Sequence, residues 1–257
     1  MGAGAPVHPC GLNGRTGGKE TDVYTDMHSH VIWGVDDGAR TKEETFRMLQ
    51  DSAADGIGAI VCTPHITPGV YEFPEETFLE HFREAEAYIE QEQLPIKLYR
   101  GAEILYTDST PRLIREGKIA SLAESGYFLI EFSPTDTKAH IFGAIQKIAG
   151  TGAVPVIAHM ERYPAIGKTE DAKELKRRYG ALIQINARSL TRKQPFFRRK
   201  FFDALFREGI CDLIATDTHC MEGRGTCMTA GMNAARDKYG EGTARRLEEK
   251  AQRIIAI

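Results

Sequence analysis

Residues 57–65 read Ile-Gly-Ala-Ile-Val-Cys-Thr-Pro-His, a continuous apolar run that ends at a threonine, a proline and a histidine. A strand of a parallel sheet needs such a run, because helices bury both of its faces. Before it, residues 41–55 carry apolar side chains at helical spacing. This stretch therefore predicts a helix followed by a buried strand, with His65 just past the end of the strand.

Strand and helix alternate in the same way along the rest of the chain. Further strands are expected near residues 23–27 and at 95–105, 127–132, 154–159, 181–186 and 210–216. Further helices are expected at 74–91, 108–118, 138–149, 170–179 and 196–207, and from about residue 226 onward. Seven alternations of strand and helix favour parallel strands with helical crossovers. A closed or nearly closed barrel accommodates that many units and leaves few strand edges unpaired. We predict an α/β fold, a distorted (β/α)7 TIM-like barrel in a single domain, with an open doubly wound sheet as the alternative.

The composition fits a globular protein without a nucleic-acid or membrane partner. The chain has 257 residues, 42% of them hydrophobic and 27% charged, and a net charge of -3. No apolar run approaches the length of a membrane span. Residues 1–20 are glycine-rich and predict a disordered leader before a domain at 21–257. Five cysteines without paired spacing predict reduced thiols and a cytoplasmic location.

Side chains that can bind metal ions stand at the ends of six predicted strands. They are His28, His30, His65, Glu103, Glu131, His159, Asp217 and His219. The carboxyl ends of parallel barrel strands share one face, so these side chains are expected to converge at one mouth. Taken alone, the histidines could be core or loop residues and Asp217 a turn residue. Glu131 is more informative, because a carboxylate inside an apolar strand is costly unless a cation or a partner meets it.

Imidazole and carboxylate groups without thiolates suit manganese, iron or zinc in a catalytic site. The number of predicted ligands exceeds what one ion needs. It suffices for two or three ions if one carboxylate bridges two of them. Such centres generate a hydroxide nucleophile and hold a phosphoryl group in hydrolytic enzymes. The strand ends therefore predict a hydrolytic metal centre.

Seven motifs resemble those of the polymerase and histidinol phosphatase (PHP) superfamily. They also resemble, more closely, its manganese-dependent tyrosine-protein phosphatases of bacterial capsule and exopolysaccharide loci (the CpsB/CapC type). The motifs are Asp26-Met27-His28-Ser29-His30, Asp36-Asp37-Gly38, Thr63-Pro64-His65, Gly101-Ala102-Glu103-Ile104, Leu129-Ile130-Glu131-Phe132, Ile157-Ala158-His159-Met160-Glu161-Arg162-Tyr163 and Ala215-Thr216-Asp217-Thr218-His219. The resemblance covers the chain from about Tyr24 to the C-terminus.

The resemblance implies three metal ions with overlapping ligands. The first set is His28, His30, Glu103 and Asp217. The second is Glu103, Glu131 and His159, and the third is Asp37, His65 and His219. Glu103 would bridge two ions. Arg162 and Arg224 would face the substrate phosphate, although relatives usually have proline where Gly225 follows Arg224 here.

The expected function is metal-dependent hydrolysis of phosphotyrosine in a protein by a metal-bridged hydroxide. The family implies a bacterial tyrosine kinase of capsule synthesis as the substrate, and a homo-oligomer is left open. A first alternative is a phosphatase of a small phosphomonoester such as histidinol phosphate. A second alternative is a module that binds or processes nucleic acid or polyphosphate. The basic and aromatic residues 191–206 would support it. The phenylalanines of this segment recur at helical spacing, however, which also fits an amphipathic helix that covers the barrel. Cysteine-based catalysis is rejected, because Cys10 and Arg15 are one residue short of the required spacing.

Overall fold

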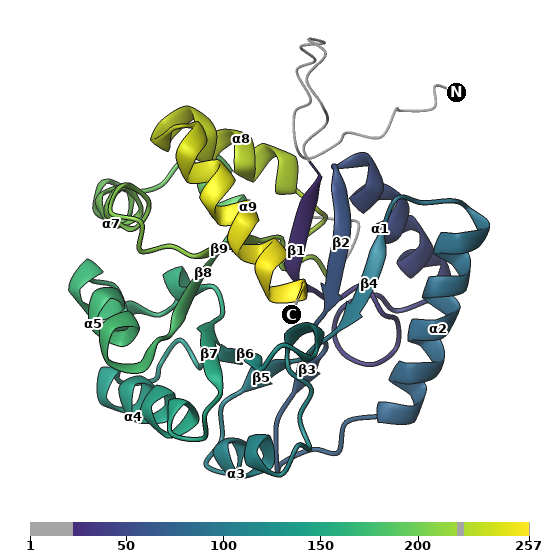
Figure 1. Ribbon diagram of the computed structural model, residues 1–257, viewed down its shortest axis with the longest axis horizontal. Coiled ribbons are helices and arrows are strands. Elements are labelled where there is room, and N and C mark those ends of the chain that lie inside the picture. The colour runs from purple at the N-terminus through teal and green to yellow at the C-terminus, as the bar shows by residue number, and fades with distance from the viewer. Residues whose placement is uncertain (1–22, 220–223, 257) are drawn as a thin grey trace, which may run out of the picture.

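The protein is described here from a computed structural model, which covers residues 23–219 and 224–256 (Figure 1). The leader predicted at residues 1–20 and its Cys10 lie outside the described residues, as does Cys220. The described cysteines, Cys62, Cys211 and Cys227, are buried, and Cys62 and Cys211 are free thiols. None of the helices in the described ranges has the length and apolar character that crossing a bilayer requires.

Parallel strands form the centre of the molecule. They are β1 (Tyr24–Ser29), β2 (Ile57–Cys62), β3 (His65–Ile66), β4 (Lys97–Arg100), β5 (Glu103–Leu105), β6 (Tyr127–Glu131), β7 (Val154–Ile157), β8 (Leu182–Asn186) and β9 (Leu213–Ala215). The predicted strand at 95–105 is interrupted at Gly101 and Ala102. A Cβ on Gly101 would lie 2.8 Å from Cγ1 of Val61, so the backbone passes close to β2 there.

The strands close into a distorted barrel. Their order is β1-β2-β4 in one sheet and β3-β5-β6-β7-β8-β9 in the other, and β2 continues into β3 as β4 continues into β5. A parallel bridge between Ser29 and Thr218 brings the chain after β9 back to β1. The His30 amide donates to the Thr218 carbonyl at 2.9 Å, and the Asp217 amide donates to the His28 carbonyl at 2.9 Å. The predicted barrel of parallel strands is confirmed.

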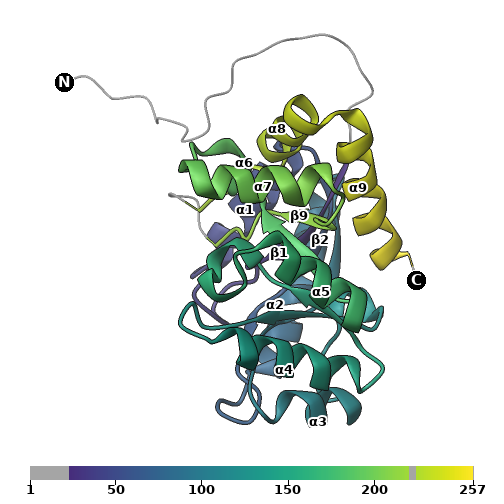
Figure 2. The same ribbon diagram turned by 90° about the vertical axis from the view of Figure 1, so that its left-hand side faces the viewer.

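Helices surround the strands (Figure 1). They are α1 (Lys42–Ala54), α2 (Glu75–Gln91), α3 (Thr110–Arg115), α4 (Lys138–Ala149), α5 (Thr169–Tyr179), α6 (Ala187–Thr191), α7 (Phe196–Arg207), α8 (Met228–Tyr239) and α9 (Glu241–Ile255). In Figure 2, α3 and α4 lie on the opposite side of the molecule from α8 and α9. The last predicted strand starts later than residue 210, because the Ile210 and Cys211 amides donate to the Leu205 carbonyl near the end of α7.

The last helix, α9, packs against the barrel at the end where the strands begin. A buried apolar cluster joins strand residues such as Met27, Leu129 and Val156 to Ala251 and Ile254 of α9. Glu248 of α9 accepts a hydrogen bond from the Thr25 amide near the start of β1 at 3.3 Å. The opposite end of the barrel, where the strands finish, is the end at which the predicted ligands stand.

Candidate metal centre

The predicted ligands lie at the carboxyl ends of the strands, as expected from a parallel barrel. His28 is in β1 and His30 follows it, while Asp37 is in the next loop. His65 begins β3, Glu103 begins β5 and Glu131 ends β6. His159 follows β7, and Asp217 and His219 follow β9. The structure therefore brings all nine predicted metal-binding residues to one mouth.

Glu103 is at the centre of this group. Its Oε2 atom lies 3.0 Å from Nε2 of His28, 3.2 Å from Nε2 of His30 and 3.1 Å from Nδ1 of His65. Glu103 is completely buried, yet this oxygen has no aligned hydrogen-bond partner. Adjacent ligands of an octahedral ion with bonds of about 2.1 Å stand about 3.0 Å apart. The spacing around Oε2 is therefore the spacing of ligands that share an ion.

The first predicted set is assembled as a group. His28, His30, Glu103 and Asp217 each offer a ligand atom, and these atoms lie within 4.8 Å of one another. All four residues are buried. Oδ1 of Asp217 lies 3.5 Å from Nε2 of His28 and 3.8 Å from Nε2 of His30.

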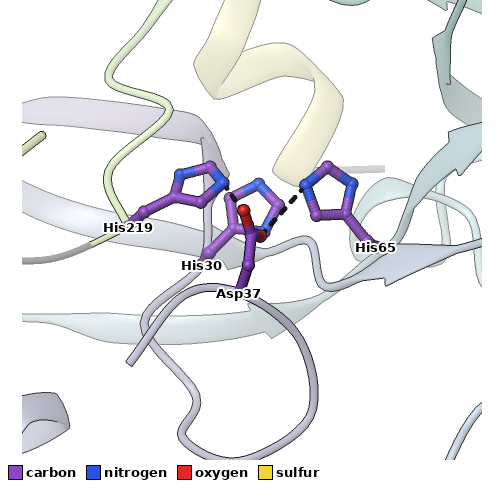
Figure 3. A group of neighbouring side chains, drawn as sticks. All are labelled: His30, Asp37, His65 and His219. Carbon is purple, nitrogen blue, oxygen red and sulfur yellow. Dashed lines mark ion pairs between the residues drawn. The ribbon is translucent and has the colours of Figure 1, made fainter. Parts of the chain in front are cut away.

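A second group joins His30 to the predicted third set, Asp37, His65 and His219. Figure 3 shows the three imidazole rings and the Asp37 carboxylate gathered around one point. Oδ1 of Asp37 lies 3.3 Å from Nε2 of His65 and 3.4 Å from Nε2 of His219. The His219 Nε2 atom is buried and has no hydrogen-bond partner, so its lone pair is open to a cation.

The remaining set surrounds Glu131. His65, Glu103 and Glu131 form a third group, in which the His65 ring lies 3.6 Å from Glu131. Nε2 of His159 lies 2.8 Å from Oε1 of Glu103 and 3.6 Å from Oε1 of Glu131. Glu103 thus contacts side chains of all three predicted sets, as a bridging ligand would.

Neighbouring polar groups fix which ring nitrogens face the centre. Asp36 lies 2.7 Å from Nδ1 of His30, so this nitrogen carries the proton that the carboxylate accepts. Oε1 of Gln184 lies 3.3 Å from Nδ1 of His28 and also accepts from the His159 amide at 2.7 Å. Each Nε2 is then left with a lone pair for a metal ion, the usual arrangement around metal-binding histidines.

The charge state of the acids suits cation binding. Burial is the largest influence on the pKa of Glu103 and of Asp217 and acts to raise it, but the neighbouring groups, His28 foremost, together outweigh burial and lower both pKa values below their usual range. The contact of His159 with Oε1 of Glu103 at 2.8 Å adds to this effect. Burial and the nearby Glu103 raise the pKa of Glu131 to about 7. Two carboxylates are therefore anionic at neutral pH, and a cation beside Glu131 would ionise the third.

Two of the ligands have an unusual backbone. His159 has a φ of 28° and Asp217 a φ of 53°, in the left-handed region that residues other than glycine rarely adopt. Such strain concentrates at functional sites, where the surrounding structure holds it.

The two predicted arginines flank Asp217. Arg162 donates to Oδ2 of Asp217, and Arg224 donates to Oδ1 at 3.1 Å. The Arg224 carbonyl accepts from the His219 amide at 3.1 Å and from the Thr218 hydroxyl at 2.9 Å, which fixes the backbone at Arg224 beside the mouth. Both arginine side chains are 40% exposed and therefore accessible to a phosphate at the mouth.

The prediction missed the residues that support the ligands. Asn186 donates to Oδ2 of Asp217 at 2.8 Å and accepts from Gln184 at 2.8 Å. The sequence does hold a signal for both, because Gln184 and Asn186 are polar residues in an otherwise apolar strand. Asp36 was also missed, since adjacent aspartates give no indication of which one turns toward the histidines.

These observations fit a metal centre. The donors are imidazole nitrogens and carboxylate oxygens, the ligands that suit manganese, iron and zinc. Two of the buried donor atoms, Oε2 of Glu103 and Nε2 of His219, lack a hydrogen-bond partner. Buried polar atoms are almost always paired, so the two atoms indicate a missing cation partner.

Comparisons with known proteins agree with this geometry. The family model "Capsular polysaccharide synthesis, CpsB/CapC" matches residues 24–256. The "Tyrosine-protein phosphatase CpsB" of Streptococcus pneumoniae is 30% identical over 227 residues, which cover 86% of this chain and 93% of that protein. The "Putative tyrosine-protein phosphatase CapC" of Staphylococcus aureus is 30% identical and covers 77% of this chain and 78% of its own length.

Solved structures share the fold. A structure from a study of YwqE from Bacillus subtilis and CpsB from Streptococcus pneumoniae, described as metal-dependent tyrosine phosphatases, has a TM-score of 0.81 at 24% identity. The match covers 90% of this chain and 94% of that one. Histidinol phosphate phosphatase of Lactococcus lactis has a TM-score of 0.54 at 15% identity, with 89% and 93% of the two chains covered.

Proposed function

We propose that this chain, which belongs to the CpsB/CapC family of capsular polysaccharide synthesis proteins, is a metal-dependent phosphatase of phosphotyrosine in proteins. The observation that carries the proposal is the Glu103 carboxylate, buried and within 3.2 Å of four imidazole rings beside two accessible arginines. Relatives that match most of the chain are named tyrosine-protein phosphatases. The nine predicted ligands would hold two or three ions, with manganese first and iron or zinc as alternatives.

Bound divalent ions would supply an activated water at neutral pH and neutralise charge on the phosphoryl oxygens. The chain's own residues would position the substrate. Arg162 and Arg224 hold their guanidinium groups on either side of Asp217, where their planar forks can each take two phosphoryl oxygens. Phenolate leaves readily because the pKa of a free phenol is about 10, so the reaction needs no dedicated proton donor.

The substrate is proposed to be a phosphorylated bacterial tyrosine kinase of the capsule or exopolysaccharide machinery, which would place the enzyme in the cytoplasm. The buried free thiols of Cys62 and Cys211 are consistent with a reducing compartment. The family description, which refers to capsular polysaccharide synthesis, supports the setting.

The test is hydrolysis of a phosphotyrosine peptide and of histidinol phosphate by chelator-treated protein, before and after Mn²⁺ is added. We expect peptide turnover only with metal, and its loss in His159→Ala. His140→Ala is the matched control, because His140 is exposed and lies outside the metal groups. If only histidinol phosphate is hydrolysed, the proposed substrate becomes a small phosphomonoester instead of a protein. Absence of metal-dependent turnover of both would contradict the proposal.

A further inference from the structure

A cavity of about 320 Å³ adjoins the metal centre. Five arginines line it: Arg162, Arg188, Arg192, Arg198 and Arg224. Two carboxylates line the same cavity, those of Asp217 and Glu161. The Asp217 carboxylate already accepts hydrogen bonds from Arg162 and Arg224. Oε1 of Glu161 accepts from the Asn186 amide at 3.0 Å and from the Ser189 hydroxyl at 2.7 Å, which holds this acid in the wall of the cavity.

Three of the five arginines have no anionic partner among the described residues. The Arg188 guanidinium donates to the Gly225 carbonyl, and that of Arg198 donates to the Glu161 carbonyl at 2.8 Å. In the part of the chain that the structure describes, the Arg192 guanidinium forms no hydrogen bond or ion pair. Carbonyl oxygens carry no net charge, so the cavity has a surplus of positive charge.

Local structure brings these arginines together. Arg188 lies in α6, and Arg192 follows one helical turn later at the C-terminal end of that helix. Arg198 is in the first turn of α7, where its guanidinium reaches the Glu161 carbonyl next to Arg162. The basic and aromatic segment 191–206 thus has two separate roles. Phe202, Leu205 and Phe206 are buried in the core, whereas Arg192 and Arg198 line the cavity.

We propose that this cavity is a second anion subsite, which binds an anionic oxygen group carried by the substrate a few residues from the phosphotyrosine. The group is an acidic side chain or a second phosphoryl group on the same peptide, since arginine forks pair with carboxylates and phosphates alike. The inference rests on the proposed function, because the cavity shares Arg162, Arg224 and Asp217 with the metal centre. The subsite makes the enzyme selective for phosphotyrosine in an acidic sequence.

The experiment compares kcat/KM for three phosphotyrosine peptides of equal length. One has neutral neighbours, one has glutamates beside the phosphotyrosine, and one has phosphoserine at the same positions; p-nitrophenyl phosphate is the reference substrate. The enzymes are wild type, the double variant Arg192→Gln/Arg198→Gln and the control Arg199→Gln. Arg199 is an exposed arginine of α7 that stacks over the Phe196 ring and does not line the cavity.

The wild type is expected to prefer both acidic peptides over the neutral one by roughly tenfold, as two partly exposed charge pairs allow. The double variant loses this preference and keeps its activity on p-nitrophenyl phosphate, while Arg199→Gln retains the preference. A larger gain with phosphoserine than with glutamate assigns the cavity to a phosphoryl group, and the reverse assigns it to carboxylates.

Equal rates on all three peptides in the wild type, or a preference that survives in the double variant, would overturn the subsite. Failure of the proposed function is distinguishable, because metal-loaded wild type would then hydrolyse none of the three phosphotyrosine peptides. A third result would also overturn the proposal: the wild type shows no preference among the peptides, single-stranded RNA inhibits it in a salt-dependent way, and the double variant is not inhibited. This result would assign the cavity to nucleic acid. If the double variant does not fold, Arg192→Gln alone gives the comparison.

Discussion

At the residue scale, the Asp36 carboxylate holds the loop between β1 and α1 against the metal centre. It contacts Nδ1 of His30, and it accepts from the Gly38 amide at 2.8 Å and from the His65 amide at 3.0 Å. The adjacent Asp37 reaches His65 and His219. The two aspartates therefore have different roles, one orienting ligands and one offering a ligand atom.

Asp36→Asn should weaken metal binding without unfolding the protein. The amide keeps the shape of the side chain, but an NH2 group replaces one of the two carboxylate oxygens and cannot accept, so the three hydrogen bonds cannot all be kept. Loss of such a supporting partner typically lowers metal affinity about 10- to 100-fold. Calorimetric titration with Mn²⁺ measures the change, and Asp108→Asn, at an exposed acid paired with Lys147, is the control. Unchanged affinity in Asp36→Asn would exclude the orienting role.

Asp26, beneath the ligands, should make the stability of the metal-free protein depend on pH. Burial raises its pKa from 3.8 to about 6, although it accepts from the Thr216 hydroxyl and amide and from the His28 amide. The folded state therefore holds this proton more tightly than the unfolded state. The resulting stability is fully present below pH 4 and is lost as pH rises through 6, by about 3 kcal/mol in total.

Asp26→Asn removes this dependence. The free energy of unfolding of wild type minus that of the variant, measured in urea from pH 4 to 7.5, should fall as pH rises. A flat difference would show that the hydrogen bonds from Thr216 compensate fully for burial. The subtraction cancels the titration of the other acids near the mouth.

At the element scale, α6 positions Arg188 and packs against α8. A Cβ on Gly231 of α8 would lie 2.7 Å from Cβ of Ala187 at the start of α6. On α4, a Cβ on Gly143 would meet nothing within 4 Å. The two glycines are both inside helices and differ in the space around them.

Gly231→Ala should lower the free energy of unfolding by about 1–3 kcal/mol, because α6 and α8 must separate. Gly143→Ala should raise it by up to about 1 kcal/mol, since alanine restricts the unfolded chain and favours helix. Urea denaturation of both variants checks the pair. Equal effects of the two substitutions would contradict the close packing of α6 on α8.

The elements were predicted better than their ends. Continuous apolar runs such as 57–62 fixed the strands, and the polar residue after each run identified its carboxyl end. The interruption at Gly101 and the late start of β9 depend on contacts with β2 and α7, which no local pattern reports. For the same reason the supporting role of Asp36 escaped prediction, whereas the predicted ligands were indicated by chemistry and position.

At the scale of the whole molecule, the metal centre joins the two ends of the barrel. His28 and His30 come from the first strand, and Asp217 and His219 follow the last. Few backbone hydrogen bonds connect these segments at the closure, which rests on the isolated bridge between Ser29 and Thr218. Ions held by both segments would strengthen the closure.

Mn²⁺ should therefore raise the melting temperature of chelator-treated protein, because an ion that binds only the folded state stabilises it by mass action. At 100 times the dissociation constant, one site contributes about 2.7 kcal/mol. Differential scanning calorimetry measures the shift. In Glu103→Gln the shift should be largely lost, whereas Glu72→Gln, a carboxylate outside the metal groups, should retain it. An equal shift in Glu103→Gln would contradict the bridging role.

The central claim is that the strand ends hold metal ions around Glu103. The most direct test is diffraction from crystals grown with Mn²⁺, with anomalous scattering recorded at the manganese edge. The account predicts separate peaks, one enclosed by His28, His30, Glu103 and Asp217 and another by Asp37, His65 and His219. A map with no peak at this mouth, from protein that hydrolyses the phosphotyrosine peptide, would contradict it.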